Sequence, residues 1–341
     1  MKASEEPRSA GLTWSSDERP GLSRRRSGRG FCYRDPEGRL VREPKTLARI
    51  RALAIPPAWE DVWISPDPNG HVQATGRDAR GRKQYRYHPD WTAYAASHKF
   101  ARLPAFASRL PRLHARLEED LSRRGPRKEK VLATAVRLLE ITLIRVGNAA
   151  YARQNRSFGL TTLHKRHLEV DGSVLTFEFR GKSGKEHRVK VSDRRLARVV
   201  RALEGLPGQH LFKYRDAEGD LCAVTSDDVN AYIREAMGEQ FSAKDFRTWA
   251  ATVSAARAFC EMEAPASEAD ARRKVSTCMK AVAGLLGNTP TVCRAAYVHP
   301  HVIALYEGGT IADLLPDPQA ERFDATLARL LNEAASADAA A

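Results

Sequence analysis

Five polar residues in four separate segments have side chains that together could break and rejoin a phosphodiester bond. A tyrosine with an ordinary pKa of about 10 becomes a nucleophile when neighbouring cations favour its phenolate. Two arginines can hold the nonbridging oxygens of a phosphate and stabilise the charge added in a five-coordinate transition state. An asparagine can donate a further hydrogen bond there, and a lysine can protonate a departing sugar oxygen. The candidates are Arg145, Lys182, Arg247, Asn288 and Tyr297.

Each of these residue types also has an ordinary structural role. An arginine can lie at a helix edge, a lysine in a solvated turn, an asparagine at a left-handed helix end and a tyrosine in the core. Any one of these roles explains one residue. Five such roles at once explain the set poorly, so we interpret the residues as one reactive site.

Helical and then strand-like patterns position the first two candidates. In KEKVLATAVRLLEITLIRVGNAAYARQ apolar residues recur every three or four positions, which predicts a packed helix with Arg145 at the border of its buried face. SVLTFEFRGKSGKEHRVKVS alternates with period two, so Leu175 and Phe177 share one side of a strand. The glycines of GKSG turn the chain, which predicts a β-hairpin with Lys182 at its tip.

Further helices position the other three candidates. Arg247 lies just inside the start of a helix predicted over about 245–260. Thr289 and Pro290 are typical of the N-cap and first residue of a short helix that leads to Tyr297. Other helices are predicted after Ser192, after the capping box of Thr225 and Asp228, and over about 267–286 and 318–336.

The chain is expected to form two folded domains of the α+β class. Residues 29–98 contain short strand-like runs separated by Gly and Pro turns, which predicts a small β-rich domain. Residues 99–341 are mainly helical with the inserted hairpin, and end in an alanine-rich tail that we expect to fray. Residues 1–28 contain SRRRSGRG and are predicted to be a flexible basic arm.

The charge of the chain favours a polyanionic partner. Lysine and arginine number 56 against 42 aspartates and glutamates, a net charge of +14. Such an excess concentrates polyanions, and nucleic acid is the leading partner. The alternative is a basic enzyme whose arginines line solvated helix faces. No apolar run is long enough to predict a membrane span.

Neither a metal nor a cofactor is expected. The five cysteines are scattered and form no CxxC pair, so the sequence predicts no zinc site or disulfide framework, and a reducing cytoplasm fits. The N-terminus has no apolar signal segment. The sequence also lacks a Walker A pattern and a close acidic cluster of the kind that holds magnesium.

The segments that carry these residues resemble the type IB DNA topoisomerases, in particular the small bacterial members related to the poxvirus enzyme. The matching segments are RVGNAAY, the lysine hairpin RGKSGK, SDDVNAYIRE with KDFRTW, and the tyrosine region LGNTPTVCRAAY, together with DARGRKQYRYH in the β-rich domain. They run from about Phe31 to Glu307 in the family's order.

The resemblance implies a catalytic core shared with tyrosine recombinases and a role for each candidate. Tyr297 would form a 3′-phosphotyrosyl link, the two arginines and Asn288 would stabilise the transition state, and Lys182 would act as general acid. Supercoils would relax by strand swivelling, and religation would need neither ATP nor metal. The enzyme would be a monomeric clamp on duplex DNA in the cytoplasm, associated with the nucleoid. Several relatives have histidine at Asn288, and since an amide cannot move a proton, its role here would be electrostatic.

The resemblance also implies DNA contacts. In GRKQYRYH, tyrosines alternate with polar side chains that can read base edges. The alternative is a basic edge strand whose charge prevents aggregation. The expected contacts are Arg82, Gln84, Tyr85 and Tyr87 in the β-rich domain, with Asn148, Tyr151, Lys165 and Lys185 in the helical domain.

Two other functions remain open at this point. A tyrosine recombinase shares the chemistry, but usually has a histidine-rich signature around its second arginine and a helical N-terminal domain, whereas this chain has KDFRTW and a β-rich domain. A DNA-coating protein would need no reactive tyrosine.

Overall fold

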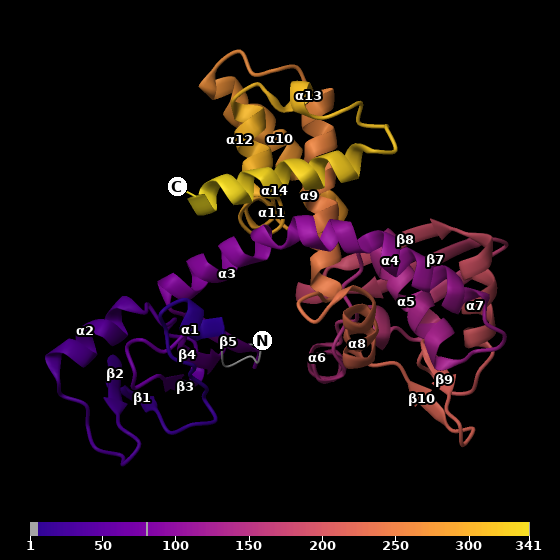
Figure 1. Cartoon of the computed structure of the whole chain (residues 1–341). Helices are drawn as coiled ribbons and strands as arrows, with labels where there is room; N and C mark the ends of the chain where they lie inside the picture. The colour runs from indigo at the N-terminus through magenta and orange to yellow at the C-terminus, as the bar shows by residue number, and fades with distance from the viewer. Residues whose placement is uncertain (1–5, 80, 341) are drawn as a thin grey trace. The chain divides into compact units, whose positions relative to one another are not determined.

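A computed structural model describes residues 6–79 and 81–340, and the chain divides into two compact units after Lys99 (Figure 1). The first unit contains a β-sheet, and the second is mainly helical. The α+β class predicted from the sequence is therefore confirmed. Within the described ranges, no helix combines the length and apolarity needed to cross a membrane.

The first unit is built on five antiparallel strands in the order β2-β1-β3-β4-β5. Leu22, Ile64 and Ala74 from three strands are buried on one face, where they pack with Ile50 of α2. Burial of this apolar surface on one side of the sheet fixes the strand register. The elements are α1 (Glu6–Ser9), β1 (Leu22–Ser27), β2 (Gly30–Arg34), α2 (Pro44–Ala52), β3 (Glu60–Ile64), β4 (Val72–Arg77) and β5 (Lys83–Tyr87), followed by α3 (Pro89–Ala101).

The predicted flexible arm over residues 1–28 is wrong for its second half, because β1 is an inner strand of the sheet. Leu22 pairs with Ile64 and is 7% exposed. The side chain of Arg24 donates hydrogen bonds to the carbonyls of Ile55 and Trp59. Leu22 is the only apolar residue of LSRRRS, so the local pattern does not indicate a strand. Residues 1–5 of the arm lie outside the described residues.

The helical unit surrounds α9, which packs against seven other helices. In Figure 1 the C-terminal helix α14 crosses α9, and it packs against both α4 and α9. The helices are α4 (Leu103–Ser122), α5 (Lys128–Thr142), α6 (Ala149–Asn155), α7 (Arg194–Glu204), α8 (Ser226–Met237), α9 (Ala243–Glu261), α10 (Glu268–Leu286), α11 (Pro290–Ala296), α12 (Pro300–Glu307), α13 (Ile311–Leu314) and α14 (Phe323–Ala340), with 3₁₀ turns at Leu160–Thr162 (η1), Lys165–His167 (η2) and Lys182–Gly184 (η3).

The predicted hairpin is present and belongs to a three-stranded sheet. β7 (Val174–Arg180) pairs with β8 (Glu186–Ser192) and, on its other side, with β6 (Leu168–Asp171). Its alternate residues Leu175, Phe177 and Phe179 are buried, as their period predicts. A second small hairpin, β9 (Lys213–Arg215) with β10 (Leu221–Ala223), was not predicted from the sequence.

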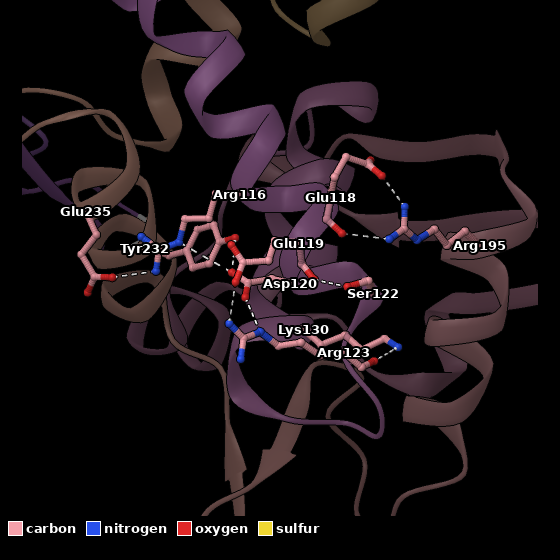
Figure 2. A network of polar contacts seen from close by, with 10 residues as sticks. All are labelled: Arg116, Glu118, Glu119, Asp120, Ser122, Arg123, Lys130, Arg195, Tyr232 and Glu235. Atoms are coloured by element: carbon pink, nitrogen blue, oxygen red, sulfur yellow. Dashed lines mark hydrogen bonds and ion pairs between the residues drawn. The ribbon is translucent and has the colours of Figure 1, made fainter.

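A buried carboxylate joins α4 to α8 (Figure 2). The side chain of Asp120 is 3% exposed and accepts hydrogen bonds from the Tyr232 hydroxyl at 2.8 Å and from Nε of Arg123 at 2.6 Å. Arg116 lies over the Tyr232 ring and donates to Glu235 at 2.8 Å. Burial and the Asp120 carboxylate both raise the pKa of Tyr232, so its proton stays in place to satisfy the aspartate.

We expect Asp120→Ala to lower the free energy of unfolding by about 2 kcal/mol, because it leaves the buried Tyr232 hydroxyl without an acceptor and removes one of the two carboxylates that Arg123 binds. Tyr232→Phe should cost about 1 kcal/mol, since it removes one hydrogen bond and keeps the ring. Urea denaturation followed by far-UV circular dichroism measures both. Arg272→Ala, which breaks an exposed ion pair with Glu268, should change stability by less than about 0.5 kcal/mol. Equal losses for all three variants would contradict this interpretation.

Candidate active site

The sequence pattern predicted Arg145 at the border of a packed helix, but the residue lies in an irregular segment just after the end of α5. Leu143 adopts a left-handed conformation (φ 54°), and its N–H donates to the carbonyl of Leu139, which ends the helix. The carbonyl of Arg145 then accepts a hydrogen bond from the Leu160 N–H at 2.8 Å. The arginine backbone is therefore held on both sides, and its side chain is half-buried.

Arg247 is buried within the first turns of α9. Only 6% of the surface of this residue is exposed to solvent. Nη1 donates to the carbonyl of Leu143 and Nη2 to the carbonyl of Leu286 at 2.8 Å. Both carbonyls lie at helix ends, where no backbone N–H of the helix can reach them. The guanidinium thus connects the end of α5 to the end of α10.

A tight turn at the end of α10 presents Asn288. Gly287 has a φ of 61°, and the N–H of Asn288 donates to the carbonyl of Ala283, as in a Schellman motif. Oδ1 of Asn288 accepts a hydrogen bond from Nη2 of Arg145 at 2.6 Å. The backbone carbonyl of Asn288 accepts one from Nζ of Lys185 at 3.3 Å.

Tyr297 lies at the C-terminal end of α11, which begins with the predicted Thr289 cap and Pro290. Its ring centroid is 5.6 Å from the guanidinium carbon of Arg247. Burial raises the pKa of the phenol, but the charges of Arg247 and Arg145 outweigh it and hold the pKa below its ordinary value. The site therefore favours the nucleophilic form of this tyrosine more than water does.

Two donors in this cluster are buried without a partner. Nε of Arg247 and Nδ2 of Asn288 make no hydrogen bond of good geometry among the residues that the structure describes, although both side chains lie close enough to the Tyr297 phenol to favour its phenolate. Burial and the neighbouring Arg145 charge lower the pKa of Arg247. Unpaired buried donors are rare and costly, and close cations repel each other. An anion with several acceptor oxygens would satisfy both donors and offset the repulsion.

Lys182 is the candidate that lies apart from this cluster. It is exposed on η3 at the hairpin tip and lines, with Arg145 and Arg247, an open pocket of about 450 Å³. Tyr297 is not one of the residues that line this pocket. The structure therefore brings four of the five candidates together and leaves the lysine at the pocket rim.

The other candidates in the helical unit have mixed positions. Asn148 caps α6 by accepting the N–H of Tyr151 at 2.9 Å, and Tyr151 is half-buried on that helix. Nζ of Lys165 donates to the carbonyl of Leu206 at 2.6 Å. Only Lys185 contacts one of the catalytic candidates, through the Asn288 carbonyl.

The four candidates in the first unit lie on or beside the edge strand β5. Tyr85 and Tyr87 are 44% and 46% exposed, and their rings stack in parallel with centroids 5.8 Å apart. Arg82 and Gln84 both bond to the carboxylate of Asp78, at 2.7 Å and 3.0 Å. The two tyrosines are thus the more accessible members of this set.

His187 is a site residue that the sequence analysis treated only as part of a strand. It lines the pocket beside Arg145 and Lys182. Its position five residues after Lys182, within the same hairpin, is the signal that could have indicated it. Across the described part of the chain, no three histidine, cysteine or acidic side chains gather as metal ligands would.

Comparison with known proteins identifies the family of this chain. Residues 89–310 match the model of the eukaryotic DNA topoisomerase I catalytic core, and residues 30–78 match the bacterial DNA topoisomerase IB N-terminal domain. The DNA topoisomerase 1B of Acanthamoeba polyphaga mimivirus is 32% identical over 84% of this chain and 88% of its own length. That of vaccinia virus (strain Copenhagen) is 20% identical over 73% of this chain and 76% of its own length. The chain therefore belongs to the type IB DNA topoisomerases, a family of isomerases.

Proposed function

We propose that this protein relaxes supercoiled duplex DNA by cutting and resealing one strand through Tyr297. The phenolate oxygen attacks the scissile phosphorus, the bond from phosphorus to the 5′-oxygen breaks, and a 3′-phosphotyrosyl link replaces it. Lys182 gives its proton to the departing oxygen, because a bare alkoxide is a poor leaving group. After the cut strand has swivelled, the 5′-hydroxyl attacks the link and releases the tyrosine.

One observation carries this proposal: three distant segments bring a tyrosine, two arginines and an asparagine into one cluster whose buried donors lack acceptors. Nη2 of Arg145 is bonded to Asn288, and Arg247 lies over the ring of Tyr297. A phosphate held there would accept hydrogen bonds from groups that the protein leaves unsatisfied. Such preorganised donors favour a transition state with more negative charge than the substrate.

We also propose that the reaction needs neither a metal nor ATP. Arg145, Arg247 and Lys182 supply the positive charge that a metal ion provides in other phosphoryl transfers. The energy of the broken phosphodiester is kept in the phosphotyrosyl link, so resealing needs no nucleotide. We further propose that the enzyme acts as a monomeric clamp around DNA in the cytoplasm, associated with the nucleoid.

Purified protein should relax positively and negatively supercoiled plasmids in EDTA without ATP, on DNA that lacks any recombination site. Tyr297→Phe should abolish both relaxation and the covalent adduct seen on denaturing gels, because it removes the nucleophile. DNA binding should persist, which distinguishes an enzyme from a coating protein. Activity that requires magnesium and nucleotide, or one particular recombination site, would overturn the proposal.

Lys182→Ala should slow single-turnover cleavage of ordinary DNA by about 100-fold or more, within the range of general-acid effects. A substrate with sulfur in place of the 5′-oxygen should be cleaved at nearly the normal rate, because a thiolate leaves without protonation. Lys280→Ala, at an exposed lysine of α10 that does not line this pocket, is the control. Equal losses on both substrates would exclude Lys182 as the acid.

The double variant Tyr85→Ala/Tyr87→Ala should weaken duplex binding by about tenfold, or about 1.4 kcal/mol, if these rings contact DNA. Cleavage at saturating protein should stay unchanged, since the rings do not touch the reacting atoms. Titration of a labelled duplex and single-turnover rates separate the two effects. Leu40→Ala, which is equally exposed near the opposite sheet edge, should leave affinity unaltered. If binding is unaffected in the double variant, β5 is not a DNA contact.

A further inference from the structure

The imidazole of His187 is wedged between two glycines that belong to different parts of the site. A methyl group added at Gly181 would lie 2.5 Å from Cδ2 and 2.6 Å from Nε2 of this ring. A methyl group added at Gly287 would lie 2.9 Å from its Cε1. Gly181 directly precedes Lys182, and Gly287 directly precedes Asn288. The ring therefore fills the space between the lysine hairpin and the asparagine turn.

Packing fixes the orientation of this ring. His187 is the register partner of Phe179 across the β7–β8 hairpin. The two rings stack with centroids 5.1 Å apart and planes 11° apart. Phe179 is buried in the core, so the imidazole cannot tilt without moving a core side chain.

The charges around His187 favour its neutral form. Burial is the largest effect that lowers its pKa, and repulsion from Arg145, Arg247 and Lys185 adds to it, whereas Glu186 opposes it. Near neutral pH the ring is thus an uncharged spacer among cations. Protonation would add a further positive charge to the same space and push the two segments apart.

We propose that His187 is a positioning residue: its neutral ring sets the distance between the Lys182 hairpin and the Gly287–Asn288 turn. This inference rests on the proposed function, in which Lys182 protonates the leaving oxygen. The ring acts by contact with the two glycines and needs no contact with DNA. Lys185 strengthens the same junction from the hairpin side through its bond to the Asn288 carbonyl.

The first test measures whether His187 acts through Lys182. His187→Ala should slow cleavage of ordinary DNA by about 10- to 100-fold, the loss expected from a displacement of about 1 Å. It should slow cleavage of the 5′-sulfur substrate by less than about threefold, because that substrate needs no acid. His210→Ala, at an exposed histidine of the same unit, should have no effect on either substrate.

The two hypotheses fail in different ways. One outcome is that the 5′-sulfur substrate restores the cleavage rate of Lys182→Ala but not that of His187→Ala. In that case the positioning role of His187 is wrong, and the assignment of Lys182 as general acid is retained. If sulfur restores neither variant, the general-acid assignment fails first. Duplex binding and thermal unfolding of each variant show whether it is folded.

A double-mutant cycle tests the wedge without reference to the acid. Gly181 has a φ of −96°, so alanine fits its backbone and only the ring opposes the added methyl group. Gly181→Ala should lower the cleavage rate by about tenfold or more in the normal protein but by less than about threefold in His187→Ala. Independent effects that simply multiply would overturn the proposal.

His187→Gln supplies the pH test. The glutamine amide can occupy the position of Nε2 of the His187 ring, but it does not titrate. Cleavage at neutral pH should therefore stay within about threefold of the normal rate. The normal protein should lose activity as the pH falls through the His187 pKa, below its ordinary value of about 6.5. The glutamine variant should lack this acid loss. The same acid loss in both proteins would show that His187 is not the titrating group.

Discussion

The site depends on one buried guanidinium. Arg247 binds the terminal carbonyl groups of α5 and α10 and lies over the ring of Tyr297. Taking a charge out of water is unfavourable unless polar partners replace the solvent. Here the partners are helix-end carbonyls that no backbone N–H of their own helices can reach. The guanidinium therefore gains acceptors, and the two carbonyls gain a donor. The ends of both helices, and with them the segments of Arg145 and Asn288, are held around the same group.

This arrangement concentrates positive charge around Tyr297. Burial and the neighbouring Arg145 charge lower the pKa of Arg247, and the charges of both arginines help to lower the pKa of Tyr297. Hydrogen bonds to fixed carbonyls and to Asn288 hold both arginines in place, so little reorganisation is needed when an anion enters. Lys182 differs because it lies on an exposed turn. The groups that we propose to bind phosphate are thus largely held in place in advance, whereas the proposed proton donor lies on a separate element.

Local patterns predicted much of the fold, and long-range pairing explains most errors. The hairpin that carries Lys182 and the Thr289 cap follow from alternation and capping chemistry within a few residues. The strand at Leu22 was missed because its partner Ile64 is distant and its own residues are mostly polar. The helix end before Arg145 was missed because Leu143 adopts a left-handed conformation, which leucine rarely does. Residue type and order indicated the site set, but the bond of Lys165 to Leu206 and the wedge at His187 exist only after folding.

The attachment of Tyr297 to the core has a mechanical consequence. Its backbone carbonyl accepts a hydrogen bond from Thr252 of α9 at 3.2 Å, and the adjacent Val298 is fully buried. A DNA end joined to this residue would pull on the buried core of the helical unit and not on a loose tail. Torque from a rotating strand would then be distributed over many packed side chains. The bond between Tyr297 and DNA could carry this force without local unfolding of the segment around Tyr297.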